Sequence, residues 1–195
     1  MIPHVIASGE LAVLILSKLL GPELKGSIKV KNGGGWAGAI GEADSRLSNN
    51  LDVALVLGPY EKPGPNKREI DKIRIYSLLR DASQDSLVRV ILLKTPVEGL
   101  LFRVPGILFQ LVGREPTAEQ LARARIKPQE VLAELLGVKP DALVEVLRPR
   151  LEAVDLTPLT TVPGIRRLRR FMRVCARRYE ARLARRALED SNETV

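Results

Sequence analysis

The sequence predicts an α/β fold, in which a four-stranded, mainly parallel sheet carries helices on both faces and is followed by a helical C-terminal region. Three observations predict this fold. Short apolar segments alternate with amphipathic ones over roughly the first hundred residues, glycines and prolines separate them, and only helical periodicity remains beyond about residue 113. The chain has 195 residues, of which 45% are hydrophobic and 4% aromatic, so it is able to bury a core of aliphatic side chains.

Four segments have the character of β-strands. Each is mostly apolar or alternates apolar with polar residues, and turn-forming residues lie beside each one. They span residues 4–7, 27–31, 52–57 and 87–93. The third is continuously apolar after its first residue, which is typical of a strand buried on both faces.

Three helices separate these strands, at residues 10–20, 36–47 and 67–80. Gly21 and Pro22 end the first of them. A strand, a helix and a second strand form a β-α-β unit, in which the strands run parallel and the crossover is right-handed. We therefore expect a Rossmann-like sheet with a ligand site at the carboxyl ends of its strands.

The pattern divides the chain into three regions. They are an α/β domain at 1–113, a helical region with a linker at 114–162, and an arginine-rich helix with a tail at 163–195. In the middle region, Pro128 and Pro140 each stand where a helix begins, since proline is favoured at the first helical position. These two units predict a small helical hairpin.

Positive charge is concentrated near the C-terminus. The segment from Ile165 to Arg186 contains ten arginines and one acid, Glu180, which gives it a net charge of +9, whereas the whole chain carries +8. The rest of the chain is therefore close to neutral. The arginines are Arg166, Arg167, Arg169, Arg170, Arg173, Arg177, Arg178, Arg182, Arg185 and Arg186.

The same segment predicts a long helix with one apolar face. Its apolar residues recur at steps of three and four, namely Ile165, Leu168, Met172, Cys175, Tyr179 and Leu183. Because arginine makes bidentate contacts with phosphate, we interpret the helix as a contact to a nucleic-acid backbone. Two other interpretations stay open: a helix packed on the core with its arginines solvated or paired with acids, and a contact to an anionic membrane surface. We expect the α/β domain to fold without this segment.

The expected carboxyl edge of the sheet defines a candidate cleft. The residues that follow the strands there are Ser8, Gly33, Gly34, Gly35, Trp36 and Tyr60. The glycines formally match the G-x-G-x-x-G pattern of phosphate-binding loops, but they follow the second strand, and the acid usual in dinucleotide sites has no clear counterpart. A turn that requires small residues is the favoured interpretation.

Three carboxylates, Glu10, Glu61 and Glu98, lie near the same strand ends and are the candidates for catalysis. If they converged, they would hold Mg²⁺ for phosphoryl transfer. The favoured alternative is that they are solvated, with Glu10 and Glu98 at helix starts, where the helix dipole stabilises an acid.

Single copies of two reactive residue types exclude several functions. One cysteine, Cys175, excludes an internal disulfide and a cysteine-based metal site, and one histidine, His4, argues against a Ser-His-Asp triad. We expect His4 to be packed or at an edge. Cys175 lies near arginines, which would lower its pKa, but a packed thiol is the favoured interpretation.

Four features at the strand ends occur in the order of a known fold. A first apolar strand leads into Gly9 and a helix, a glycine pair follows the second strand, the third strand is very apolar, and Pro96 and Glu98 follow the fourth. In these features the N-terminal hundred residues resemble the Toprim fold of topoisomerases, primases and nucleases of the overcoming-lysogenization-defect type.

The chain departs from the Toprim pattern at the acids that hold divalent metals. The family carries a glutamate immediately before the first glycine, where this chain has Ser8. It carries Asp-x-Asp at the end of the third strand, where this chain has Gly58, Pro59 and Tyr60. The resemblance therefore implies a relative that kept the scaffold and lost the metal ligands.

These observations together predict a non-catalytic, Toprim-like protein that binds nucleic acid or another polyanion through its C-terminal helix. The family resemblance suggests a subunit of a nucleic-acid-processing or phage-defence complex, in a homo- or hetero-oligomer. One alternative is a Mg²⁺-dependent nuclease that uses Glu10, Glu61 and Glu98, the only case in which we expect a cofactor. The other is a scaffold protein that docks the helix on an acidic protein partner. The sequence shows neither a membrane span nor a targeting segment, so we expect a cytoplasmic protein.

Overall fold

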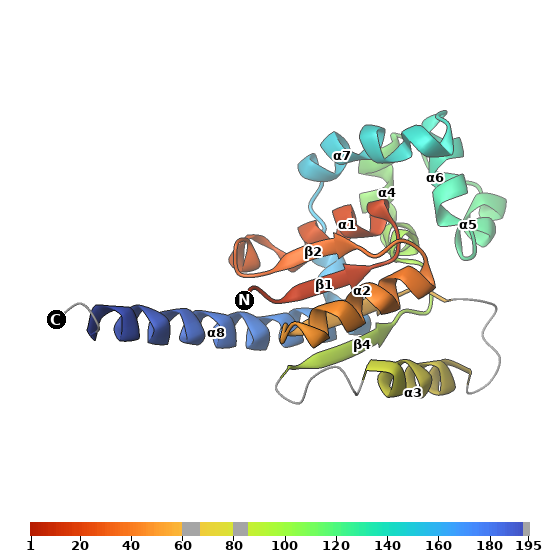
Figure 1. Ribbon diagram of the computed structural model, residues 1–195. Coiled ribbons are helices and arrows are strands. Elements are labelled where there is room, and N and C mark those ends of the chain that lie inside the picture. Colours follow the sequence, from red (N-terminus) through yellow and green to blue (C-terminus); the bar gives the residue numbers. More distant parts are fainter. Residues whose placement is uncertain (60–66, 80–85, 193–195) are drawn as a thin grey trace.

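The computed structural model describes residues 1–59, 67–79 and 86–192, and it confirms the predicted fold class (Figure 1). Four parallel strands form one sheet in the order β2-β1-β3-β4. The strands are β1 (His4–Ala7), β2 (Lys29–Asn32), β3 (Val53–Leu57) and β4 (Val88–Leu92). Helices cover both faces of this sheet, and a group of shorter helices lies beside it (Figure 1).

The helices alternate with the strands and then follow one another to the C-terminus. The α-helices are α1 (Glu10–Leu20), α2 (Trp36–Ser48), α3 (Lys67–Leu79), α4 (Pro105–Val112), α5 (Ala118–Ala124), α6 (Pro128–Leu136), α7 (Leu143–Ala153) and α8 (Pro163–Asn192). Short 3₁₀ helices connect them, namely η1 (Pro22–Leu24), η2 (Val97–Arg103), η3 (Pro140–Ala142) and η4 (Thr157–Thr161). Pro128 and Pro140 begin α6 and η3, as the sequence predicts.

Side chains on the two faces of the sheet belong to two separate apolar clusters. On one face, residues such as Leu55 pack with α2 and α3. On the other face, residues such as Val5, Val56 and Ile91 pack with α1, η2, α4, α6, α7 and α8 in a larger cluster. The helical region and the start of α8 therefore share one core with the sheet.

Basic side chains outside α8 hold this core together by bonding to helix ends. The Lys18 ammonium group donates hydrogen bonds to the carbonyl oxygens of Leu151 and Glu152 in the last turn of α7, the second at 2.6 Å. The Arg150 guanidinium group donates to the Leu111 carbonyl near the end of α4, at 2.6 Å. The last carbonyls of a helix have no partner within it, so cations at this position stabilise the helix end.

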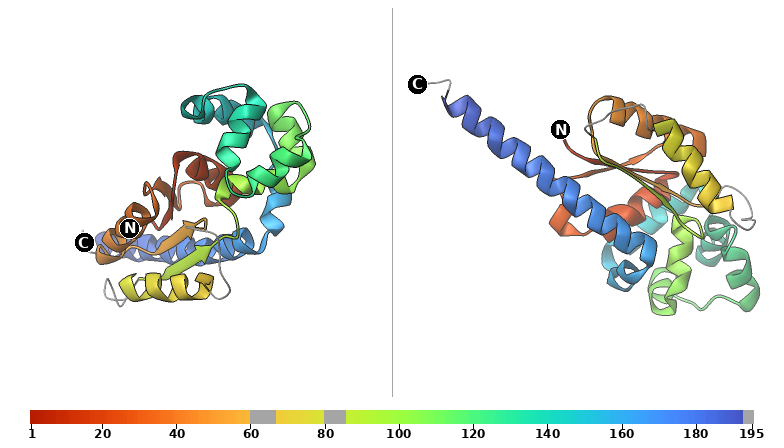
Figure 2. Two further views of the ribbon diagram at one scale, coloured as in Figure 1. Left: turned by 90° about the vertical axis from the view of Figure 1, so that its right-hand side faces the viewer. Right: turned by 90° about the horizontal axis from the view of Figure 1, so that it is seen from below.

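Helix α8 is one continuous rod of 30 residues that begins against the sheet and extends past it (Figures 1 and 2). We divide it into an inner segment, residues 163–182, and an outer segment, residues 183–192. Most buried residues of the helix lie in the first half of the inner segment, whereas the side chains of residues 183–189 are all exposed. Within the described residues, no helix combines the length and apolar character that crossing a bilayer requires.

Candidate nucleic-acid interface and carboxyl edge of the sheet

The start of α8 is fixed against β4 by close packing. A Cβ atom at Gly164 would lie 2.5 Å from Cδ2 of Leu93, so a larger residue there would displace the Leu93 side chain. Beyond it, Ile165, Leu168 and Met172 are fully buried. The inner segment therefore presents one face to the sheet and turns its arginine-rich face outward.

Three of the ten arginines form ion pairs with the protein's own acids. Nη2 of Arg169 lies 2.5 Å from Oε1 of Glu23, and Nη2 of Arg173 lies 3.3 Å from the same oxygen. The hydrogen bond from Arg169 is the main reason that the pKa of Glu23 is lowered. Nη1 of Arg178 lies 3.3 Å from Oδ1 of Asp52, a buried carboxylate that also accepts a hydrogen bond from the backbone N–H of Leu87. These contacts fasten α8 to η1 and to the start of β3.

The remaining seven arginines have no ion pair within the described part of the chain. All but Arg182 are exposed, and Arg182 is half-buried. They are Arg166, Arg167, Arg170, Arg177, Arg182, Arg185 and Arg186. The alternative in which intramolecular acids neutralise the helix therefore applies to a minority of its charge.

Four arginines of the inner segment form a row on its outward face. Residues four, three and four apart lie on the same side of a helix, and this spacing connects Arg166, Arg170, Arg173 and Arg177. At a rise of 1.5 Å per residue, the row is about 16 Å long. Arg173 belongs to it although it approaches Glu23, because its side chain is 52% exposed. We call these four residues the outward row.

The glycine loop after β2 is closed by its own hydrogen bonds. Oδ1 of Asn32 accepts from the backbone N–H of Gly9 at 3.0 Å and from that of Gly34 at 2.8 Å. Gly34 has a φ of +77°, which favours glycine at this position. The Gly33 N–H donates to the Ala7 carbonyl. Three N–H groups of the edge are therefore used within the protein, which supports the interpretation of the loop as a tight turn.

Other predicted cleft residues lie around this loop. Ser8 and Trp36 are half-buried and Gly35 is exposed. The Trp36 indole Nε1 donates to the Gly58 carbonyl at 3.1 Å, which links α2 to the end of β3. Tyr60 lies outside the described residues.

The three candidate carboxylates have different surroundings. Glu10 is exposed, and its Oε1 lies 3.7 Å from Nη2 of Arg148. Glu98 is 3% exposed and accepts a hydrogen bond from Gln129 at 2.8 Å, and its burial raises the pKa of its carboxyl group. Glu98 lies in the first turn of η2, as expected, but the expectation that it is solvated is wrong, because it is buried where α6 packs against η2. Glu61 lies outside the described residues, and among residues 1–59, 67–79 and 86–192 no group of three potential ligands is placed to hold a metal ion.

The single histidine and the single cysteine are both packed. His4 is 5% exposed, and burial, with Arg46 and nearby lysines, lowers its pKa to about 4. Cys175 is fully buried, and burial raises the pKa of its thiol to about 12. The lowered thiol pKa that neighbouring arginines would cause is not observed, because desolvation outweighs their charge.

One further set of basic residues lies together in the structure without any signal in the sequence. Lys94, Arg103 and Arg125 come from three separate segments, and the structure places them with Arg167 around adjoining cavities at the end of β4. No local motif connects them, and the packing of α5 against η2, beside the end of β4, brings them together.

No protein-family model, curated protein or solved structure matches the chain. Its function is therefore inferred from the geometry and charge of its own residues.

Proposed function

We propose that the protein is a Toprim-like nucleic-acid-binding protein that contacts the phosphate backbone through the outward face of α8. One observation carries the proposal: the four arginines of the outward row lie on an exposed face of the inner segment whose opposite face is buried, and three of them have no ion-pair partner in the described chain. The position of the helix is fixed by the core, so its free charges are presented together.

The chemistry of the row fits phosphate. Guanidinium groups bind phosphate oxygens in pairs and are desolvated more readily than ammonium groups. Like charges on one helix face repel, and an array of phosphates removes that repulsion. A row of about 16 Å covers about five base-pair steps at 3.4 Å each.

The same geometry argues for weak sequence specificity. The two aromatic residues of α8 are Phe171, which is 9% exposed, and Tyr179, which is half-buried. Neither is positioned as a free platform for base stacking. Contacts to the backbone alone fix position on a nucleic acid without reading its bases.

The arrangement of the strand ends supports the Toprim-like part of the proposal. Asn32 connects Gly9 after β1 to Gly34 after β2. A Cβ atom at Gly58 after β3 would lie 2.9 Å from Cα of Pro96, which follows β4. The positions that carry the resemblance are therefore neighbours at one edge of the sheet. Membership of a nucleic-acid-processing or phage-defence complex is part of this proposal.

The test is a salt titration of binding to duplex and single-stranded oligonucleotides by fluorescence anisotropy. For duplex DNA, each phosphate contact contributes about −0.9 to the slope of log K against log salt. We expect the triple variant Arg166→Gln, Arg170→Gln, Arg177→Gln to bind more weakly and to reduce the slope by roughly 2.7. These residues are exposed and make no ion pair within the described chain, so folding should be unaffected.

A matched variant separates the row from general electrostatics. Lys29→Gln, Arg74→Gln, Lys139→Gln removes the same number of positive charges from exposed positions outside α8 that make no ion pair within the described chain. We expect it to retain most of the affinity. Equal losses in both triple variants would show that net charge alone drives binding. No measurable binding at about 50 mM salt would contradict the proposal and favour an acidic protein partner.

A further inference from the structure

Two adjoining cavities lie at the carboxyl end of β4. The smaller, about 170 Å³, is bounded by Lys94, Thr95, Arg103 and the start of α8, including Arg167. The larger, about 520 Å³, shares the first three of these residues and is bounded on its other side by Arg125 and neighbouring residues of α5 and η2. We call the two cavities together the basic cleft.

Four cations from four parts of the fold surround the basic cleft, and no acid lines either cavity. Lys94 follows β4, Arg103 ends η2, Arg125 follows α5 and Arg167 lies in α8. All four are exposed, and none forms an ion pair within the described residues. A hollow lined by charges of one sign concentrates the electrostatic field and attracts ions of opposite charge.

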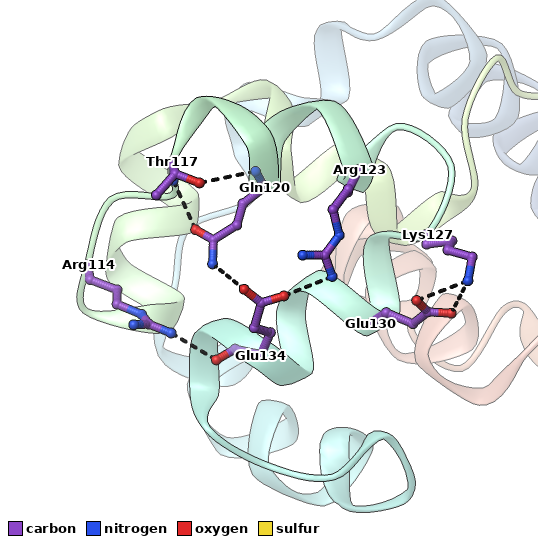
Figure 3. A network of polar contacts seen from close by, with 7 residues as sticks. All are labelled: Arg114, Thr117, Gln120, Arg123, Lys127, Glu130 and Glu134. Carbon is purple, nitrogen blue, oxygen red and sulfur yellow. Dashed lines mark hydrogen bonds and ion pairs between the residues drawn. The ribbon is translucent and has the colours of Figure 1, made fainter.

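The polar network on α5 and α6 shows how this charge stays uncompensated. Figure 3 shows Glu134 directed toward Arg123, with 2.9 Å between Oε2 and Nη2. Lys127 pairs with Glu130 at 2.8 Å in the same view. Both acids of α6 are therefore paired with cations of α5 and α6 or the turn between them. Arg125 lies between Arg123 and Lys127 in the sequence, but it lines the basic cleft instead.

The larger cavity also has an apolar wall. Phe102 is half-buried, Leu121 is 41% exposed, and both line it. Behind them lies a further hollow of about 340 Å³, lined partly by Leu108 and Phe109. A volume of about 520 Å³ lies within the usual range for small-molecule sites, and an aromatic side chain is able to stack on any nucleobase.

A hydroxyl group adds to the polar side of the cleft. Thr95 lines both cavities, and its buried Oγ1 has no hydrogen-bond partner within the described structure. Buried hydroxyls normally have one. This hydroxyl lies beneath the surface of the cleft, and a rotation of the Thr95 side chain would bring it to a ligand.

We propose that the basic cleft binds a nucleoside diphosphate, with its phosphate groups against Lys94, Arg103 and Arg167 and its base against Phe102 and Leu121. The cleft shares no residue with the outward row, so this ligand site is separate from the proposed backbone contact. The chemistry that it recognises is a phosphorylated nucleotide, either free or at the end of a strand.

Isothermal titration calorimetry of the full chain with ADP, pyrophosphate and adenosine tests the proposal. At about 50 mM salt, we expect ADP to bind about tenfold more tightly than pyrophosphate, and adenosine to give no measurable binding. Absence of ADP binding, or equal affinity for ADP and pyrophosphate, would overturn the nucleotide assignment.

Substitutions in the cleft locate the site. Lys94→Gln and Arg103→Gln should each weaken ADP binding about tenfold, because each removes a charged contact to phosphate. Phe102→Leu should weaken binding of ADP but not of pyrophosphate. The exposed control Lys139→Gln should leave both affinities within about twofold of the parent chain. Unchanged ADP binding in Lys94→Gln and Arg103→Gln would refute the site, and thermal melting of each variant verifies its fold.

Two further arms separate this proposal from the backbone contact and identify the source of the nucleotide. The triple variant Arg166→Gln, Arg170→Gln, Arg177→Gln should bind ADP as the parent chain does, and a loss there would contradict a separate site. A 5′-phosphorylated tetranucleotide that displaces ADP, when its unphosphorylated form does not, identifies a strand end; displacement by neither supports a free nucleotide. Equal displacement by both forms would show that ADP lies on the backbone-binding surface and would overturn the proposal.

Discussion

The inner and outer segments of α8 belong to one helix and both contain leucines and arginines, but they have different surroundings. In the inner segment, Leu168 and Met172 are fully buried, and Arg178 reaches a buried carboxylate. In the outer segment, the apolar positions Leu183 and Leu188 are 45% and 67% exposed. One helix therefore serves as a wall of the core over part of its length and extends free of it over the rest.

The length of the sheet, and not the residue pattern of the helix, sets where the packing of α8 ends. A strand of five residues such as β4 is about 17 Å long, whereas a helix of 30 residues is about 45 Å long. A helix of this length that packs alongside such strands therefore extends beyond the end of the sheet. Apolar spacing predicts which face of the helix would pack, but it contains no information about how far the partner surface extends.

Truncation of α8 should have the largest effect on the stability of the chain. The sequence predicts that the α/β domain folds without the residues after Val162, but the structure gives the opposite expectation, because that cut removes Ile165, Leu168 and Met172 from the core. We expect the chain ending at Val162 to be unfolded by circular dichroism. The chain ending at Arg182 lacks only the outer segment and should melt within a few degrees of the full chain. Equal melting temperatures for the two truncations would contradict the assignment of the inner segment to the core.

A pair of leucine substitutions tests the same contrast at single residues. Leu168→Ala leaves a cavity in the core and should lower the free energy of unfolding by about 3 kcal/mol. Leu183→Ala removes the same atoms from an exposed position and should change it by less than about 0.5 kcal/mol. Urea denaturation measures both, and similar values would show that the outer segment also packs.

The Arg178–Asp52 contact should contribute more than the other ion pairs of the inner segment. Asp52 is 4% exposed, and Asp52→Ala leaves both the Leu87 N–H and the Arg178 guanidinium group without this acceptor. We expect a loss of about 2 kcal/mol in urea denaturation. A loss as small as that of a surface pair would indicate that water replaces the carboxylate.

The Glu23–Arg169 contact is more exposed and supplies the matched comparison. At neutral pH, Glu23→Gln should cost less than about 1 kcal/mol, because solvent screens a carboxylate that is 41% exposed. The pKa of Glu23 is lowered in the folded state, so its stabilising effect is present above its ordinary value of 4.5 and is lost as the pH falls through the lowered pKa. The stability difference between parent and variant should therefore vanish in acid, and a difference that persists would assign the effect to packing.

The reactivity of a cysteine thiol tests the difference between the two segments with the least change to the protein. Cys175 is buried with a pKa of about 12, so a disulfide reagent should not modify it in the folded chain at neutral pH. A cysteine introduced by Leu183→Cys in a Cys175→Ala background should react at a rate typical of an exposed thiol. Rapid modification of native Cys175 would show that the inner segment opens readily.

The sequence predicts the layers of this fold well because each depends on local periodicity. Continuous apolar runs mark β3, and steps of three and four mark α1 and α8. One error has a tertiary cause: Glu98 is buried because α6 folds over η2. Leu183 lies on the apolar face that the sequence predicts, but it is exposed because the sheet ends before it. The sequence does not predict the basic cleft for a related reason. Lys94, Arg103 and Arg125 become neighbours only when the helical region packs beside the sheet.

The absence of a break in α8 between residues 163 and 192 has a mechanical consequence. Contacts with Asp52, Glu23 and the leucines beneath it hold the helix rigidly against the globule. The described residues therefore contain no hinge between the outer segment and the sheet. A partner that binds the outer segment therefore sets the orientation of the whole molecule. Torque applied to the end of the helix is transmitted to the Arg178–Asp52 ion pair.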